Sequence, residues 1–355
     1  MISEQLQSDA ARLLRSAGVQ GSSFRWTPVS GGANNKVFRI DLSEGSFLLK
    51  VYFRHPGDLR DRLKTEFSFI RFAWDNGIRS VPQPFAFDAE NQIGLYEFID
   101  GRRIDSTEIT SERVAQAACF YQELNRYRNL PEALMLPAAS EACFSVTDHL
   151  GCVERRLSML QNIEISSSLR QEASSFIRKE LTETWERTRE FVLSSAREMD
   201  LPVETEIASD ERRLSPSDFG FHNALLQQDG RIRFIDFEYA GWDDPGKLAA
   251  DFFCLQGVRV PNCYYDLFVE AIVHDDPSPV RQRERIRFLC AIHRVKWCFI
   301  LLNDFLPVGS DRRRFSNDAA VRVERERIQL RKAREAENET RQILPKAISI
   351  SDVGR

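Results

Sequence analysis

The sequence predicts an α+β fold, in which a small N-terminal antiparallel sheet of five strands with a helix precedes a larger, mostly helical part. Short runs of aromatic and β-branched residues, separated by glycine- and asparagine-containing turns, fill much of the first 100 residues. Apolar residues at helical spacing dominate after Asp100-Gly101. A third observation is a short hairpin pattern around residues 224–236, set among the predicted helices.

The elements of the first part follow from their periodicity. Residues 2–17 carry apolar side chains at helical spacing, and Gly18 is placed to end that helix. A second helix is expected at 62–76, with Phe67, Ile70 and Trp74 on one face. The strands are expected at 24–29, 36–42, 46–53, 85–87 and 94–99, with turns at 43–45 and 90–92.

The second part is expected to consist mainly of helices. These are predicted at 111–126, 145–161, 167–199, 246–257, 262–273 and 279–306. A last stretch, 318–342, is dense in Arg and Glu with few apolar positions, which is typical of a solvated helix that lies on the body or projects from it. We therefore predict three divisions, at residues 1–100, 101–310 and 311–355.

Composition excludes several classes of protein. The chain has 355 residues, 42% of them hydrophobic, which suffices for a sizeable core. A net charge of -4 does not favour nucleic-acid binding. No signal-peptide pattern and no run of about 18 apolar residues occurs, so we expect no membrane partner and a cytoplasmic location. The seven cysteines show no CxxC or zinc spacing and are expected to be reduced; the oligomeric state stays open.

The strongest chemical signal lies at residues 214–238. Asp218 is followed by Asn223 after four residues, then by a turn at 228–230 and an apolar strand that ends at Asp236. Phosphoryl transfer requires one carboxylate to orient the attacking hydroxyl and take its proton, and an amide and a second carboxylate to hold magnesium against the phosphates. We predict these roles for Asp218, Asn223 and Asp236, respectively.

These segments resemble the catalytic and metal-binding segments of aminoglycoside phosphotransferases and of choline and ethanolamine kinases. The run Asp236-Phe-Glu-Tyr-Ala-Gly-Trp-Asp-Asp-Pro245 is typical of that family, and the resemblance spans roughly residues 20–305. It implies a protein-kinase-like fold of two lobes, with ATP, or alternatively GTP, and Mg²⁺ as cofactors. The acceptor implied is a hydroxyl group of a small molecule such as a sugar, an aminoglycoside or a choline-like alcohol.

The first part contains the matching nucleotide-binding residues. A loop between two strands holds Gly31, Gly32, Asn34 and Asn35, whose backbone can approach phosphates, although any hairpin can use Gly-Gly. Lys50 lies within an apolar strand and is predicted to pair with Glu66 and the α/β-phosphates; the alternative is a strand-edge lysine that reaches solvent. The resemblance places the hinge between the lobes at 95–101, where backbone groups around Glu97 and Ile99 are expected to bind adenine.

Two departures from the family pattern stand out. Pro216 occupies the position where the family has a histidine that braces the catalytic loop. The run Asp244-Pro-Gly-Lys-Leu248 lacks the second aspartate of Asp-Pro-x-x-Asp-Leu, and Asp251 is a candidate replacement. The absence of the histidine removes no reacting group, whereas the absence of the second aspartate leaves open which residue supports the catalytic loop.

Several assignments stay open at this point. Glu238 is either an additional metal or supporting carboxylate or a residue that closes the strand, and His222 is best explained by loop packing. For the acceptor site, Trp297, Trp242 and Asp304 are candidates, as are Asp243 and Glu270. The stretch between Asp236 and Asp251 is too short for the activation loop of a protein kinase, which leaves a non-catalytic kinase-like module as the main alternative to a small-molecule kinase.

Overall fold

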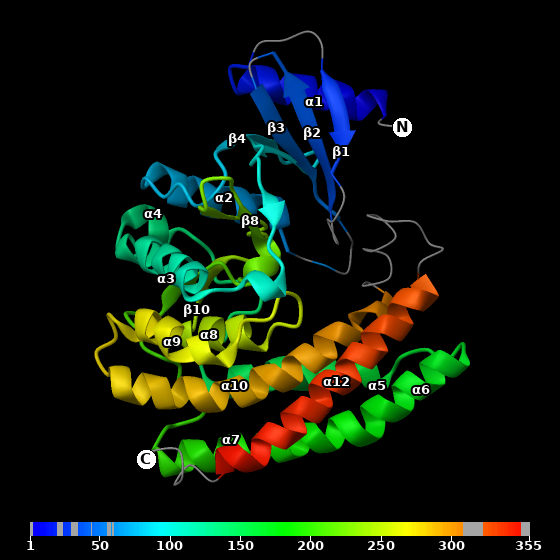
Figure 1. Cartoon of the computed structure of the whole chain (residues 1–355), viewed down its shortest axis with the longest axis vertical. Coiled ribbons are helices and arrows are strands. Elements are labelled where there is room, and N and C mark those ends of the chain that lie inside the picture. The colour runs from blue at the N-terminus through cyan, green and yellow to red at the C-terminus, as the bar shows by residue number, and fades with distance from the viewer. Residues whose placement is uncertain are drawn as a thin grey trace.

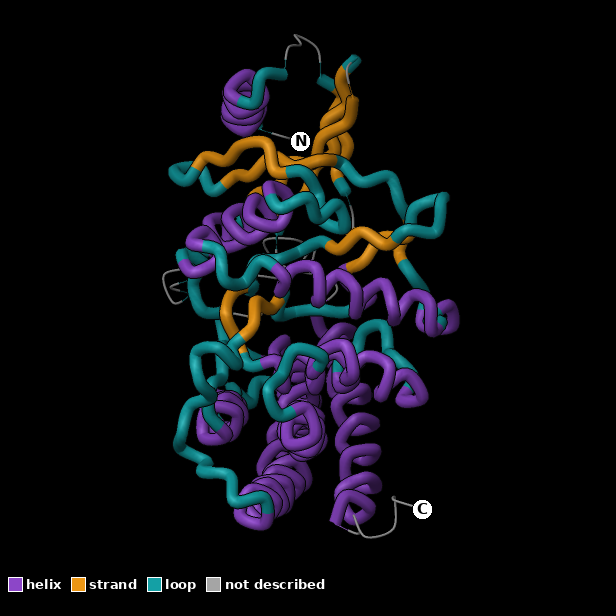
Figure 2. Tube along the Cα trace, turned by 90° about the vertical axis from the view of Figure 1, so that its left-hand side faces the viewer, coloured by secondary structure: helices purple, strands orange, loops and turns teal. Residues whose placement is uncertain are grey.

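The computed structural model describes residues 3–19, 24–29, 35–43, 45–54, 58, 60–307 and 322–348. A twisted sheet occupies one end of the molecule and a stack of helices the other, with short strands between them (Figures 1 and 2). The predicted α+β class is confirmed. Within these residues, none of the helices combines the length and the apolar composition that crossing a bilayer requires.

The sheet has five antiparallel strands in the order β1-β2-β3-β5-β4. Their bounds are Arg25–Pro28 (β1), Lys36–Leu42 (β2), Gly45–Val51 (β3), Pro84–Asp88 (β4) and Ile93–Glu97 (β5). Each of the five predicted strands is therefore present. Successive residues of a strand face opposite sides of a sheet. Alternate side chains of β3 and β5 therefore pack against different helices on the two sides of the sheet.

Helix α1 (Glu4–Ser16) covers one side of the sheet and helix α2 (Arg62–Asp75) lies on the other (Figure 1). Leu49 and Leu95 are paired neighbours in the sheet and pack with the buried residues of α1. Tyr96, the next residue of β5, packs instead with Phe67 of α2. Lys50 follows Leu49 in β3 and therefore faces the α2 side, where the functional site lies.

The helical part is arranged around α10 (Pro279–Leu301), which packs most extensively against four other helices. These partners are α5 (Val146–Gln161), α7 (Thr182–Glu198), α8 (Pro245–Cys254) and α12 (Arg322–Ile348). The remaining helices are α3 (Ser111–Arg126), α4 (Pro131–Leu134), α6 (Ser168–Phe176) and α9 (Tyr265–Val273). Because α10 is covered on several sides, its buried residues are not confined to one face.

The charged C-terminal segment forms α12, which crosses α10 and α7 (Figure 1). Leu330, Ala333 and Ala336 are buried on its inner face. Glu326 is also buried there and accepts a hydrogen bond from Arg170 of α6 at 2.6 Å. The helix thus completes a core that its composition alone did not predict, because alanine and paired glutamate contribute little to an apolar pattern.

Short strands connect the sheet to the helices. β8 (Ala224–Leu226) and β9 (Ile232–Phe234) form the predicted hairpin, and β8 also pairs with β6 (Arg102–Arg103). β7 (Arg213–Ser215) pairs with β10 (Gly241–Asp243). The loop from β7 to β8 carries Asp218, and the loop from β9 to β10 carries Asp236. Both loops open toward the sheet side that holds Lys50.

Candidate active site

The loop that carries Asp218 is held by an asparagine and a serine. Asn125 of α3 brackets Leu214, accepting its backbone N–H at 2.9 Å and donating to its carbonyl at 3.0 Å. Ser217 donates its backbone N–H to Ser215 Oγ at 3.0 Å and has φ 67°, a left-handed conformation that a non-glycine residue adopts only when its surroundings enforce it. Pro216 itself offers no side chain that could brace the loop by hydrogen bonding.

Asp218 faces the central cavity, and two neighbours in the same loop fix its carboxylate. Asn223 Nδ2 donates to the Asp218 backbone carbonyl at 3.0 Å and to Oδ2 at 3.3 Å. His222 Nε2 lies 3.2 Å from Oδ1. The sequence pattern attributed His222 to loop packing, yet its ring contacts the predicted base and lines the cavity.

The histidine fits there because two glycines make room for it. A side chain at Gly220 would approach His222 Nδ1 to 3.0 Å, and one at Gly257 would approach His222 Cβ to 3.2 Å. Both separations are tighter than ordinary van der Waals contacts. His222 Nδ1 itself is buried and has no hydrogen-bond partner among the described residues.

Lys50 joins the sheet, α2 and the loop that follows β9. Its Nζ lies 2.6 Å from Glu66 Oε2 and 2.5 Å from Asp236 Oδ1. Burial by itself lowers the pKa of Lys50, but the carboxylates of Asp236 and Glu66 outweigh burial and hold the pKa well above its ordinary value. The structure therefore brings together three residues that the sequence assigned to one phosphate- and metal-binding group.

Glu66 is anchored on several sides. Tyr52 donates its hydroxyl to Glu66 Oε2 at 2.7 Å, and the backbone N–H of Phe237 donates to Oε1 at 3.2 Å. Burial raises the pKa of Glu66. Asp236, one residue before Phe237, adopts φ 70°, and its side chain remains about one-third exposed. This loop thus combines a backbone tie to α2 with a carboxylate that is open to the cavity.

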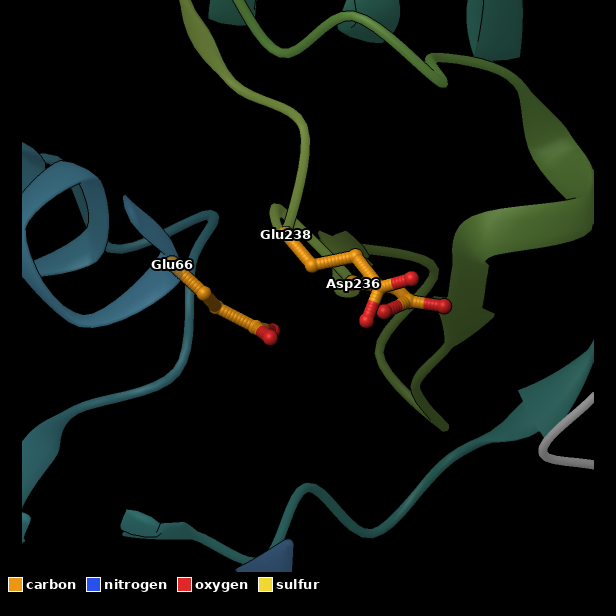
Figure 3. Close-up of side chains that lie close together, drawn as sticks. All are labelled: Glu66, Asp236 and Glu238. Atoms are coloured by element: carbon orange, nitrogen blue, oxygen red, sulfur yellow. The ribbon is translucent and has the colours of Figure 1, made fainter. Parts of the chain in front are cut away.

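Glu238 lies behind Asp236 and is fully buried. It accepts hydrogen bonds from Arg62 Nη1 at 2.7 Å and from Asn35 Nδ2 at 2.6 Å. Glu66, Asp236 and Glu238 each offer a carboxylate oxygen within 4.8 Å of the others, and their side chains converge in Figure 3. Glu238 is therefore not a surface residue, and its hydrogen bonds with Arg62 and Asn35 tie the loop to α2 and to the residue before β2.

The ligand preferences of magnesium distinguish these groups from one another. Mg²⁺ prefers oxygen ligands and is usually held by one or two protein groups together with phosphates and water. Asp236 and Asn223 meet this requirement, because both line the cavity and offer oxygen atoms to it. Glu66 and Glu238 are instead buried among cationic side chains.

The sheet side of the cavity has the character of a slot for an aromatic base. The whole cavity has a volume of about 1180 Å³. Its apolar lining near the hinge includes Val37, Leu48, Ile99, Leu225 and Ile235. Apolar surfaces of this kind suit a nucleobase.

The remaining predicted nucleotide residues have different environments. Gly31, Gly32 and Asn34 lie outside the described residues, whereas Asn35 is buried and accepts the backbone N–H of Phe53 at 3.0 Å. Ile99 lines the cavity. Glu97 does not, and its side chain accepts a hydrogen bond from Arg233 at 2.7 Å.

The opposite end of the cavity lies against α5, α8 and α10 and is rich in ion pairs. Arg156 Nη2 lies 2.5 Å from Glu141 Oε2, and Lys296 Nζ lies 2.6 Å from Asp251 Oδ2. Burial raises the pKa of Glu141, but Arg156 and the nearby lysines outweigh it and lower the pKa to about 2. Lys247 also lines this end and pairs with Asp243.

Asp251 belongs to a buried chain of hydrogen bonds rather than to the support of the catalytic loop. Its Oδ1 lies 2.9 Å from His293 Nδ1, and His293 Nε2 lies 3.0 Å from His149 Nδ1. The other His149 nitrogen lies 2.9 Å from Asp244, which also pairs with Arg285. The chain fixes α5, α8 and α10 relative to one another behind the cavity.

Of the residues considered for the acceptor site, only Trp297 lines the cavity. Trp242 donates to the Ala133 carbonyl at 3.0 Å, and Asp304 is buried beside Arg325 of α12. Glu270 is paired with Arg283 at the surface. Glu141 and Arg156, which do line the cavity, carry no motif that reveals them in the sequence.

Comparison with known proteins agrees with this geometry. Residues 25–289 match the phosphotransferase enzyme family. No curated protein matches the chain. Among solved structures, a choline/ethanolamine kinase family protein from Mesorhizobium loti superimposes with a TM-score of 0.58 at 15% identity, covering 96% of this chain and 98% of that one.

Two further structures have the same fold. A spectinomycin phosphotransferase in complex with ADP and spectinomycin gives a TM-score of 0.56 at 14% identity, covering 95% of this chain and 98% of that one. The choline kinase LicA from Streptococcus pneumoniae gives a TM-score of 0.56 at 16% identity, covering 94% of this chain and 100% of that one. Because the family match extends over most of the sequence, the chain belongs to the phosphotransferase enzyme family and has its protein-kinase-like fold.

Proposed function

We propose that the protein transfers the γ-phosphoryl group of ATP to a hydroxyl group of a small molecule. The observation that carries the proposal is that Asp218 and the Lys50–Glu66–Asp236 group open into one cavity. The apolar slot near the hinge suits adenine, and the ion-paired end of the cavity has room for an acceptor. GTP is the alternative donor, since an apolar slot does not by itself distinguish the two bases.

In the proposed reaction, Asp218 orients the acceptor hydroxyl and takes its proton as the new O–P bond forms and the bond to the β-phosphate breaks. Lys50 binds the α/β-phosphates while Glu66 keeps its ammonium group in place. Asp236 and Asn223 would hold magnesium, which neutralises charge on the phosphates. Glu238 keeps the Asp236 loop in position through its hydrogen bonds with Arg62 and Asn35.

The test is magnesium-dependent consumption of ATP and GTP with a panel of sugars, amino sugars, choline-type alcohols and nucleosides. Asp218→Asn should lower turnover on an active acceptor by about 10²–10⁴ and leave nucleotide binding by calorimetry nearly unchanged. Asp266→Asn, at an exposed position of α9, is the matched control. Near-full turnover in Asp218→Asn would refute the assigned base. Tight nucleotide binding without turnover on any acceptor would favour a non-catalytic module.

A further inference from the structure

The end of the cavity remote from the hinge has an unusual balance of donors and acceptors. Its carboxylates are already occupied by cationic partners. Asp251 accepts hydrogen bonds from Lys296 and from Trp297 Nε1, the latter at 2.9 Å, in addition to its contact with His293. Both oxygens of Glu141 contact Arg156. These carboxylates are already neutralised by their partners, so a cationic ligand would gain less from them than from an unpaired carboxylate.

The cationic side chains, in contrast, retain unused hydrogen-bonding capacity. Arg156 has five N–H groups, and both of its hydrogen bonds to Glu141 are made by Nη2, so Glu141 does not engage Nη1. Lys296 has three N–H groups and pairs with a single residue, Asp251. An oxyanion in the cavity could therefore accept hydrogen bonds from both side chains without breaking either ion pair.

An apolar wall stands beside these donors. Met159 of α5 and Trp297 and Ile300 of α10 line the same end of the cavity, together with Leu306. Such a wall favours a ligand with a hydrocarbon portion.

Resting on the function proposed above, we propose that the acceptor is a hydroxyl compound that carries an oxyanion, bound by Arg156 and Lys296, and an apolar portion that packs on Trp297. Arg156 is the specificity-determining residue, because its planar guanidinium can bind two oxygens of one carboxylate or phosphate group. Lys296 adds a point charge from the facing helix. Asp218 remains free to contact the hydroxyl group.

The experiment compares matched probes that differ in charge, at one fixed ionic strength. One set is glucuronate, glucose 6-phosphate, glucose and glucosamine, and the other is 3-phenyllactate and phenylalaninol. Binding to the full-length protein saturated with magnesium and a non-hydrolysable ATP analogue is measured by calorimetry, and turnover is measured separately with ATP. The phosphate and carboxylate probes distinguish the two sources of an oxyanion.

We expect the anionic probes to bind about tenfold to a hundredfold more tightly than their cationic counterparts. Arg156→Gln should remove this preference, and Arg156→Lys should restore only part of it. Arg155→Gln, at the exposed neighbouring position of α5, should keep it. Melting temperatures of all three variants show whether each is folded.

Tighter binding of glucosamine and phenylalaninol would overturn the proposal, as would an anion preference that survives Arg156→Gln. Binding of the ATP analogue without binding of any anionic probe would also count against it. These outcomes are distinct from failure of the proposed function, in which anionic probes bind but no probe is phosphorylated.

Discussion

Oε1 of Glu238 accepts a hydrogen bond from Nη1 of Arg62 at 2.7 Å, and both side chains are almost completely removed from solvent. Glu238→Ala should therefore destabilise the protein by about 3 kcal/mol, because it removes a partner from a buried cation. Glu238→Gln keeps the size of the side chain and should cost less. Urea denaturation measures both, with the exposed Glu132→Ala as control. Equal stability of Glu238→Ala and wild type would contradict a positioning role.

Lys50 and Lys36 provide a matched pair for testing the phosphate site. Lys50 is buried between Glu66 and Asp236, whereas Lys36 is exposed at the start of β2. Lys50→Ala should abolish most of the rise in melting temperature that millimolar nucleotide and magnesium produce, because a ligand stabilises only the state that binds it. Lys36→Ala should retain that rise. Equal losses in the two variants would move the phosphate anchor elsewhere.

His222 should affect turnover rather than nucleotide binding. His222→Ala removes the ring that lies 3.2 Å from Asp218 and should lower kcat by about ten- to a hundredfold, as expected when a reacting group is held less firmly. The dissociation constant of the nucleotide should not change. His274→Gln at the surface is the control. A loss confined to KM, or to nucleotide affinity, would argue against a link with Asp218.

The buried His293 predicts a pH dependence of stability. Burial, together with Lys296, lowers the pKa of His293 to about 3, below its ordinary 6.5, although Asp251 opposes this. Between these values the unfolded chain binds a proton that the folded chain does not, so stability should fall as pH falls below about 6.5, by about 1.4 kcal/mol per pH unit. The facing groups are Asp251, Lys296 and His149.

Denaturation midpoints at pH 7, 6 and 5 test this prediction. His293→Asn should flatten the dependence, and His274→Gln, which changes an exposed ring, should not. The buried carboxylates affect stability only at lower pH, because the pKa values of Asp244 and Asp251 are lowered below the ordinary range. An unchanged slope in His293→Asn would show that another group titrates.

Helix α12 should be required for stability although it lies far from the sheet in the sequence. Removal of residues 322–355 exposes the core that Leu330 covers. The loss of this one large apolar side chain should lower the free energy of unfolding by about 1.5–3 kcal/mol. It also leaves Arg170 without Glu326. If the deletion yields no folded protein, Glu326→Ala tests the same contact with a smaller change.

The sequence predicted the parts of the protein whose signal is local or chemically specific. The five strands follow from β-branched and aromatic runs, and Lys50 stood out because a cation in an apolar strand requires a partner. Lys50 and Asp236 are 186 positions apart, yet the motif placed them in one site and the structure brings them to 2.5 Å. Gly31, Gly32 and Asn34, and the division of the chain at residues 100 and 310, stay predictions.

The site residues that the sequence did not predict are brought together by the packing of helices, which no local sequence pattern encodes. Arg156 and Glu141 meet only because α5 lies beside the loop before it, and His149 reaches His293 across 144 positions. The contact of His222 with Asp218 depends on the space left by Gly220 and Gly257. These side chains look like ordinary surface or packing residues until the backbone has placed them.

The position of the Lys50 ammonium group sets the charge that Asp236 offers to a ligand. Oδ1 of Asp236 already contacts this cation, so magnesium at Asp236 would share the carboxylate with Lys50 rather than bind an isolated charge. Glu66 holds Lys50 from the other side, so the ammonium group keeps a buried partner while Asp236 serves a second cation. Through the same contact, Lys50 ties the loop that follows β9 to the sheet across the cavity.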